Sequence, residues 1–244
     1  MFWRIHNRLP KQGPGSDPST RRALSLVRTL PERPRILDLG CGPGRQSLLL
    51  ARETGGDVTA IDLLPPFLEQ LQESAREAGL DHRIHTRQAS MSELDDEDES
   101  FDLVWSEGAI YNIGFSHGLG LWRRLIRPGA SVAVSEATWL RNDAPDKIRT
   151  YWQQHYPGMR DQSANEVAVE RAGYRLTDSF VLPENEWWDD YYTLIESRLD
   201  TLRGERNDAS WQAAISHFDE ELEIVREGLG FFGYVFYVME KTET

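Results

Sequence analysis

Residues 35–46 have the sequence R-I-L-D-L-G-C-G-P-G-R-Q, and this stretch decides the fold. The apolar residues before its glycines predict a buried strand. Glycine then recurs at every second position, as Gly40, Gly42 and Gly44, and the apolar run 48–51 opens a helix. A glycine-rich turn between strand and helix lets a ligand approach the backbone, close to the N–H groups at the start of the helix. The stretch therefore predicts an α/β fold with a ligand site at this turn.

The spacing of these glycines and of the acid that follows them distinguishes between two cofactors. A second strand is predicted at 58–61, and Asp62 at its tip can accept hydrogen bonds from both hydroxyls of a ribose. A dinucleotide fingerprint, G-x-G-x-x-G, would need glycine where the chain has Arg45. The pattern from Asp38 is D-x-G-x-G-x-G, which resembles motif I of class I S-adenosylmethionine (SAM)-dependent methyltransferases. The alternative is a tight strand–helix turn in some other α/β protein.

Strands and helices alternate along most of the chain, which predicts a parallel, doubly wound sheet. The resemblance implies a Rossmann-like sheet of seven strands in the order 3-2-1-4-5-7-6, with strand 7 antiparallel. After the first two strands, the predicted strands are 84–88, 101–105, 131–135, 174–182 and 230–240. The predicted helices are 66–78, 119–125, 144–155, 163–172 and 209–227, and one from Asp17 or Ser19 to about Leu30. Arg127-Pro128-Gly129 predicts a turn before the fifth strand.

We interpret residues 1–244 as a single SAM-binding domain with two additions. Residues 1–18 are an N-terminal lid or, alternatively, a frayed terminus, and residues 183–229 are a cap inserted between strands 6 and 7. The stretches 12–16 and 106–115 resemble those of a bacterial subgroup of small-molecule methyltransferases. Its core is similar to that of ubiquinone- and menaquinone-biosynthesis methyltransferases. The subgroup implies a cofactor and a reaction type but no particular substrate.

The resemblance also implies which residues hold the cofactor. They are Gly40, Cys41, Gly42 and Gly44 for the methionine part; Asp62 for the ribose; Leu63, Ala89, Ser90 and Met91 for the adenine; and Glu107, Gly108 and Ala109 for the amino group or the sulfonium. Gln46 reaches the SAM carboxylate or, equally, caps the helix. Met91 packs on the adenine or is a core methionine, and Glu107 offsets the cofactor's ammonium or is a surface acid.

The acceptor pocket is less specified. Tyr111 and Asn112 are the first candidates for catalytic residues, because they directly follow the turn that faces the cofactor; loop packing is the alternative. Further candidates are His117, Glu136, His155 and the aromatic residues Trp187, Trp188, Tyr191 and Tyr192. These aromatics form a cage for a flat or cationic substrate or, as we prefer, bury a cap helix or a dimer contact.

The composition of the chain limits the classes of partner that it can bind. A net charge of −13 argues against a large nucleic-acid footprint, since phosphate binding needs clustered Lys and Arg. The sequence has no apolar stretch near the roughly 20 residues of a membrane span, and the single cysteine, Cys41, excludes an internal disulfide. We expect a cytoplasmic monomer or homodimer that takes a small-molecule substrate, and no His/Cys spacing predicts a metal.

The predicted function is SAM-dependent methyl transfer to a small molecule by in-line displacement, with S-adenosylhomocysteine (SAH) as product. Such an enzyme mainly aligns and desolvates the nucleophile. The alternative is a SAM- or nucleoside-binding protein without transferase activity, which the lack of an obvious general base permits.

Overall fold

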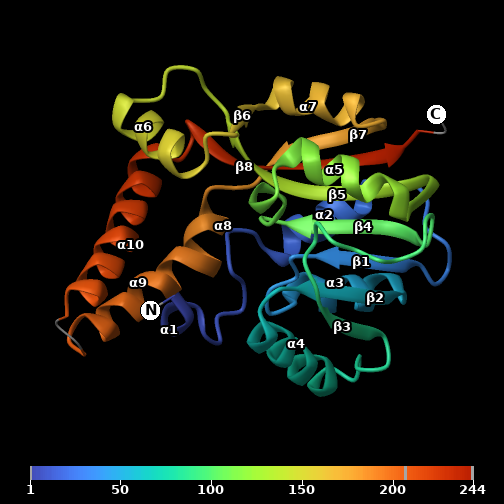
Figure 1. The fold of residues 1–244 in the computed structure, drawn as a ribbon, viewed down its shortest axis with the longest axis horizontal. Coiled ribbons are helices and arrows are strands. Elements are labelled where there is room, and N and C mark those ends of the chain that lie inside the picture. The colour runs from blue at the N-terminus through green and yellow to red at the C-terminus, as the bar shows by residue number, and fades with distance from the viewer. Residues whose placement is uncertain (1, 206–207, 243–244) are drawn as a thin grey trace.

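The computed structural model describes residues 2–205 and 208–242, and its centre is one mixed sheet (Figure 1). The strands are β1 (Arg35–Leu39), β2 (Asp57–Asp62), β3 (Ile84–Gln88), β4 (Phe101–Glu107), β5 (Ile126–Trp139), β6 (Arg160–Asp161), β7 (Tyr174–Val181) and β8 (Phe232–Lys241). Their order is β3-β2-β1-β4-β5-β8-β7, and β8 runs antiparallel to both of its neighbours. This confirms the predicted order and the antiparallel last strand. The two-residue β6, which pairs with β5, was not predicted.

The helices are α1 (Phe2–His6), α2 (Asp17–Ser25), α3 (Arg45–Thr54), α4 (Pro65–Glu77), α5 (Phe115–Trp122), α6 (Asp146–His155), α7 (Gln162–Arg171), α8 (Asn185–Trp187), α9 (Thr193–Arg203) and α10 (Ala209–Gly228). Short 3-10 turns occupy Ile110–Asn112 and Arg123–Leu125, and a π-turn at Trp188–Tyr192 joins α8 to α9. The elements of the first half follow the prediction within a few residues.

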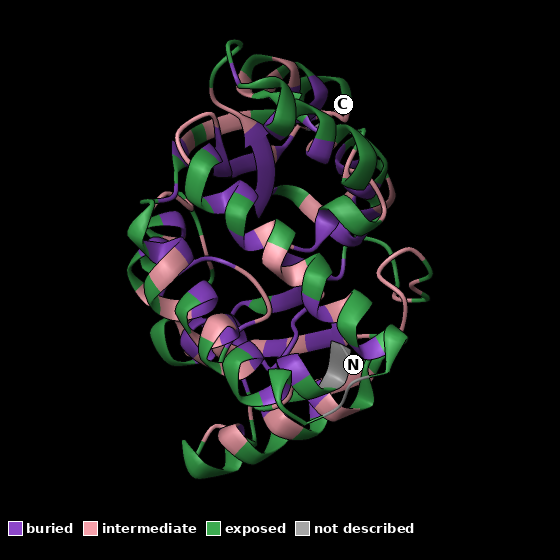
Figure 2. Cartoon of the chain, turned by 90° about the vertical axis from the view of Figure 1, so that its left-hand side faces the viewer, coloured by how far each residue is buried: buried purple, intermediate pink, exposed green. Residues whose placement is uncertain are grey.

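Two apolar clusters, one on each face of the sheet, hold the helices in place. Successive residues of a strand point to opposite faces, so Ile36 packs with α3 and α4 whereas Leu37 and Leu39 pack with α5 and α7. All of β1 beyond Arg35 is buried, as expected for a central parallel strand covered on both sides. Figure 2 shows the same division, with buried residues on the strands and the inner helix faces and exposed residues outside.

The cap lies beyond one end of the sheet, where α1, α9 and α10 gather (Figure 1). Its aromatic residues are mainly packed: Trp187, Tyr191 and Tyr192 are buried, and the ring of Trp187 stacks on Tyr192 and on Tyr234 of β8. Residues 206–207 of the predicted cap and Met1 of the predicted lid lie outside the described residues.

The structure corrects the predicted cap and the predicted end of α2, and it corrects one predicted turn. Helix α2 is capped by Ser16, whose hydroxyl accepts the Ser19 N–H, and not by Asp17 or Ser19. It ends at Ser25, because the next two amides bond three residues back and tighten the last turn. The turn predicted at Arg127–Gly129 lies within β5, where the register to β4 shifts, so the chain bulges there without leaving the sheet.

Gly44, the last glycine of the turn, is required for packing. Its φ is +82°, and an added Cβ would lie 2.2 Å from Cδ1 of Leu71 on α4. We expect Gly44→Ala to lower the free energy of unfolding by about 2–3 kcal/mol in urea titrations, because the side chain overpacks the α3–α4 contact. Gly55→Ala is the matched control, since Gly55 also has a positive φ (+65°) but no atom within 4 Å of its added Cβ. Equal losses in the two variants would contradict the packing argument.

Candidate active site

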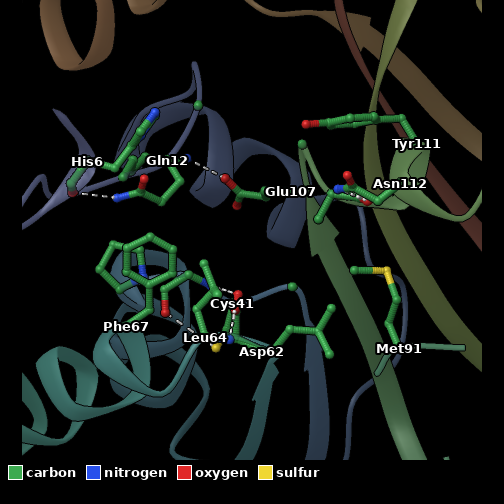
Figure 3. A pocket seen from close by; sticks show the side chains of 18 of the residues that line it. His6, Gln12, Cys41, Asp62, Leu64, Phe67, Met91, Glu107, Tyr111 and Asn112 are labelled. Carbon is green, nitrogen blue, oxygen red and sulfur yellow. Dashed lines mark hydrogen bonds and ion pairs between the residues drawn. The ribbon is translucent and has the colours of Figure 1, made fainter. Parts of the chain in front are cut away.

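A cavity of about 810 Å³ opens at the carboxyl ends of the parallel strands, between the glycine turn and the cap (Figure 3). Small-molecule sites typically enclose about 300–1,000 Å³. In an open α/β sheet, ligands bind outside these strand ends, where neighbouring connections leave the sheet on opposite faces. The location and the size both fit a small-molecule site.

All of the predicted cofactor and catalytic residues except one line this cavity. They are Gly40, Cys41, Gly42, Gln46, Asp62, Leu63, Ala89, Ser90, Met91, Glu107, Gly108, Ala109, Tyr111 and Asn112. The exception is Gly44, which the structure places at the N-terminus of α3 against Leu71.

The side chain of Asp62, at the end of β2, holds the glycine turn by accepting a hydrogen bond from its backbone. One carboxylate oxygen of Asp62 accepts the Gly42 N–H at 2.9 Å, and the other accepts the Leu64 N–H at 2.9 Å. Gly40 approaches the loop after β4 so closely that an added Cβ would lie 2.4 Å from Cβ of Ala109. The turn and the Asp62 carboxylate are therefore held rigidly on one wall of the cavity.

Asp38 supports this wall from beneath and does not line it. Its carboxylate is fully buried and accepts a hydrogen bond from the Ser47 hydroxyl of α3 at 2.5 Å. Burial raises the pKa of Asp38 to about 7. Gln46 has a similar bracing role, since its amide donates to the Cys41 carbonyl at 3.1 Å. Gln46 also lines the cavity beside the glycine turn.

Glu107, at the end of β4, is already paired. Its Oε2 lies 2.6 Å from Nζ of Lys11, and both side chains are almost fully buried. Its Oε1 accepts hydrogen bonds from the Thr20 hydroxyl at 2.8 Å and from the Trp105 indole at 2.9 Å. Glu107 is thus neither a surface acid nor an unpaired charge facing the cavity.

Residues 7–16, which we call the strap, cross the cavity between α1 and α2. The Gln12 amide donates to the His6 carbonyl at 3.1 Å, while Oε1 of Gln12 is buried and has no hydrogen-bond partner among the described residues. At the far end of the strap, the hydroxyls of Ser16 and Ser19 donate to Glu186 of α8 at 2.5 and 2.7 Å. The strap therefore links the β4 end to the cap.

The predicted adenine wall is partly apolar. Leu63 is 60% exposed. Met91 packs with the α5 side of the core. The terminal carbon of Met91 would lie 3.0 Å from a Cβ added at Gly40. Ser90 is bonded to Ser92 by its hydroxyl. Met91 thus packs at the edge of the core and also lines the cavity.

The opposite end of the cavity combines predicted residues with residues of α10 that no motif indicated. Tyr111 points into the space in Figure 3, and Asn112 caps the turn by donating to the Ala109 carbonyl at 2.9 Å. Helix α10 adds Ala214, His217, Phe218 and Glu221. Their spacing of i, i+3, i+4 and i+7 is the one available signal, because it places them on one face of a helix. His6 and Tyr191, whose rings contact each other, also line this end, whereas Phe67 lies beside Leu64 on the side of the glycine turn (Figure 3).

Several other candidates lie outside the cavity lining. They are His117, Glu136, His155, Trp187, Trp188 and Tyr192. His155 bonds the Tyr151 carbonyl and stacks on the Tyr151 ring. Glu136 is buried and accepts a hydrogen bond from the Tyr156 hydroxyl, while its Oε2 has no hydrogen-bond partner among residues 2–205 and 208–242. Burial raises the pKa of Glu136 to about 8.

Residues 2–205 and 208–242 contain neither a cluster of metal-ligand side chains nor a helix that could span a membrane. No three His, Cys, Asp or Glu residues there are grouped so that they could hold a metal ion. No helix in the same part of the chain combines the length and the apolar character needed to cross a bilayer.

The family described as "Methyltransferase domain" matches residues 36–129, which span the glycine turn, Asp62 and the end of β4. Residues 36–129 therefore form a methyltransferase domain. The methyltransferase domain has curated relatives in two reaction classes. The malonyl-[acyl-carrier protein] O-methyltransferase of Salmonella typhimurium is 38% identical over 119 residues, which are 48% of this chain and 43% of that protein.

The dimethylglycine N-methyltransferase of Parasynechococcus marenigrum is 34% identical over 195 residues, 77% of this chain and 65% of that protein. The chain therefore spans about half to two thirds of these relatives. Among solved structures, a SAM-dependent methyltransferase from Geobacter sulfurreducens in complex with SAH has a TM-score of 0.82 at 20% identity. The similarity covers 98% of this chain and 96% of that one, and it shows the shared fold.

Proposed function

We propose that this chain binds SAM and transfers its methyl group to a small-molecule acceptor. The observation that carries the proposal is the Asp62 carboxylate, held at the carboxyl end of β2 by two backbone amides and facing the cavity beside the glycine turn. An acid at this place can bind the two hydroxyls of a ribose. The family match over residues 36–129 adds independent support.

The lining fits SAM by size and by chemistry. A cavity of about 810 Å³ exceeds the volume of one such cofactor and leaves space for an acceptor. The glycines leave the wall free of side chains at Gly40 and Gly42. The unpaired Gln12 Oε1 is a buried acceptor that can take a hydrogen bond from the cofactor's ammonium. We assign that contact to Gln12 in place of Glu107, whose charge Lys11 already balances.

When bound, SAM would supply a methyl group on a positively charged sulfur. A lone pair of the acceptor attacks the methyl carbon in line, and the sulfur leaves as the thioether of SAH. The protein then has to align the acceptor and exclude water. We assign the second task to the strap and the cap, which act as a lid on the 1–244 domain, because Ser16 and Ser19 join them through Glu186. Tyr111 lies in the 3-10 turn that follows β4 and lines the cavity, and we assign it to the binding of the acceptor.

The same fold also occurs in a protein named for a different activity. The [4+2]-cyclase SpnF has the same fold, with a TM-score of 0.73 over 97% of this chain and 86% of that one, at 19% identity. The fold alone thus does not establish methyl transfer. A SAM- or nucleoside-binding protein without transferase activity would bind the cofactor and release no methylated product from labelled SAM mixed with metabolite extracts.

Calorimetric titration with SAM and with SAH tests the cofactor. We expect micromolar binding by the wild type and at least tenfold weaker binding by Asp62→Ala, a loss of about 1.4 kcal/mol or more. Asp57→Ala is the matched control, because Asp57 lies at the other end of the same strand, outside the cavity lining. No binding by the wild type would overturn the proposal.

We also infer a cytoplasmic chain that acts on small molecules and not on nucleic acid. The net charge of −13 and the single, buried Cys41 support this inference. Sedimentation would decide between the monomer and the homodimer.

A further inference from the structure

The acceptor end of the cavity is built around one carboxylate, that of Glu221. This residue ends the inward stripe of α10, after His217 and Phe218, and it faces the side of the cavity that Tyr111 and Tyr191 line. The Tyr192 hydroxyl donates to its Oε1 at 2.7 Å, which orients the carboxylate from the cap. The residues around Glu221 are thus mainly aromatic rings.

The cavity supplies no side chain of fixed positive charge for Glu221. Lys11 is the one Lys or Arg in the described lining, and it pairs with Glu107 at 2.6 Å. The basic groups that act on Glu221 are the imidazoles of His217 and His155. Burial raises the pKa of Glu221, which is the expected result for a carboxyl group without a close counter-charge. A buried carboxylate in this situation is stabilised when a ligand brings the missing cation.

We propose that the acceptor is a basic amine with an apolar body and no carboxylate of its own, held by Glu221 and the rings of Tyr111, Tyr191 and Phe218. This proposal rests on the proposed function, and it names the substrate class of the same site. Aromatic faces attract ammonium groups and also bury the apolar body. An amino-acid or acyl-acid acceptor would need a Lys or Arg for its carboxylate, and the only one in the described lining is already paired.

The Glu221 carboxylate is also positioned to accept a proton from such an amine. A primary or secondary amine that arrives as an ammonium ion must release one proton before its nitrogen lone pair is available. The Glu221 carboxylate accepts that proton and becomes a neutral carboxyl group, and the amine becomes neutral, so the charges balance. A carboxyl group with a raised pKa performs this transfer more readily than an exposed one.

The test uses three probes of nearly equal size on the full chain saturated with SAH: 2-phenylethylamine, 2-phenylethanol and 3-phenylpropanoate. Calorimetry measures their affinities without any turnover. We expect the amine to bind at least tenfold more tightly than the acid or the alcohol. Glu221→Gln is expected to weaken amine binding at least tenfold and to leave the SAH affinity unchanged, because glutamine keeps the hydrogen bond from Tyr192 and removes the charge.

Glu220→Gln is the matched control, since it removes the same charge from an exposed neighbour on the same helix. Equal binding of the amine and the acid by the wild type would overturn the proposal even if every variant failed to fold. Amine binding that Glu221→Gln leaves unchanged would also overturn it. Absence of SAH binding would instead overturn the proposed function, so the two failures are distinguishable.

Discussion

Lys11→Met is expected to lower the free energy of unfolding by about 3–5 kcal/mol, because it leaves the Glu107 carboxylate buried without its cation. The side chains of Lys11 and Glu107 are only 6% and 3% exposed, and their charged atoms lie 2.6 Å apart. Removing one partner of such a pair costs far more than the pair contributes, since the remaining charge stays in a poorly solvating environment. Urea unfolding of the wild type and the variant measures the loss.

A double-mutant cycle identifies the cause. Lys11→Met combined with Glu107→Gln removes both charges, so we expect the double variant to recover at least half of the loss. Lys147→Met is the control, because Lys147 pairs with Glu223 and Glu227 at the surface. We expect Lys147→Met to leave the free energy of unfolding unchanged within experimental error. If Lys11→Met costs no more than Lys147→Met, the buried pair does not hold the strap to β4.

Glu136→Gln is expected to make the protein more stable at pH 8, by roughly 2–4 kcal/mol, and to leave its stability at pH 4 nearly unchanged. Burial raises the pKa of Glu136 to about 8 in the folded chain, from 4.5. The folded state therefore binds the proton more tightly than the unfolded state does. Stability from this group is complete below pH 4.5 and is lost as pH rises toward 8, because ionisation favours the unfolded chain. Glutamine does not ionise and removes this slope.

Urea titrations at pH 4, 6 and 8 measure the difference between variant and wild type, which removes the contribution of the other titrating groups. Glu170→Gln serves as the control, since Glu170 is exposed on α7, and its curve should run parallel to that of the wild type. The same offset between Glu136→Gln and wild type at all three pH values would show that folding does not shift the pKa of Glu136.

The sequence by itself determined the sheet and one wall of the cavity. The strand β1, the glycine turn and Asp62 lie within 28 residues, and they depend on local properties: apolar runs, positive φ angles and an acid at a strand tip. Alternation of strands and helices then predicted a parallel, doubly wound sheet, and the resemblance to class I methyltransferases implied the order of its strands. Gly44 was assigned to the cofactor on the motif alone, whereas its contact is with Leu71.

Only the tertiary structure decided which charged groups meet at the site. Lys11 and Glu107 are 96 residues apart, and nothing in either neighbourhood predicts that they meet. Glu221 reaches the cavity because α10 packs beyond the strand ends, and its stripe resembles that of any helix that faces a core. A buried charge depends on which distant group lies within a few ångströms, since solvation and ion pairing act through space and not along the chain.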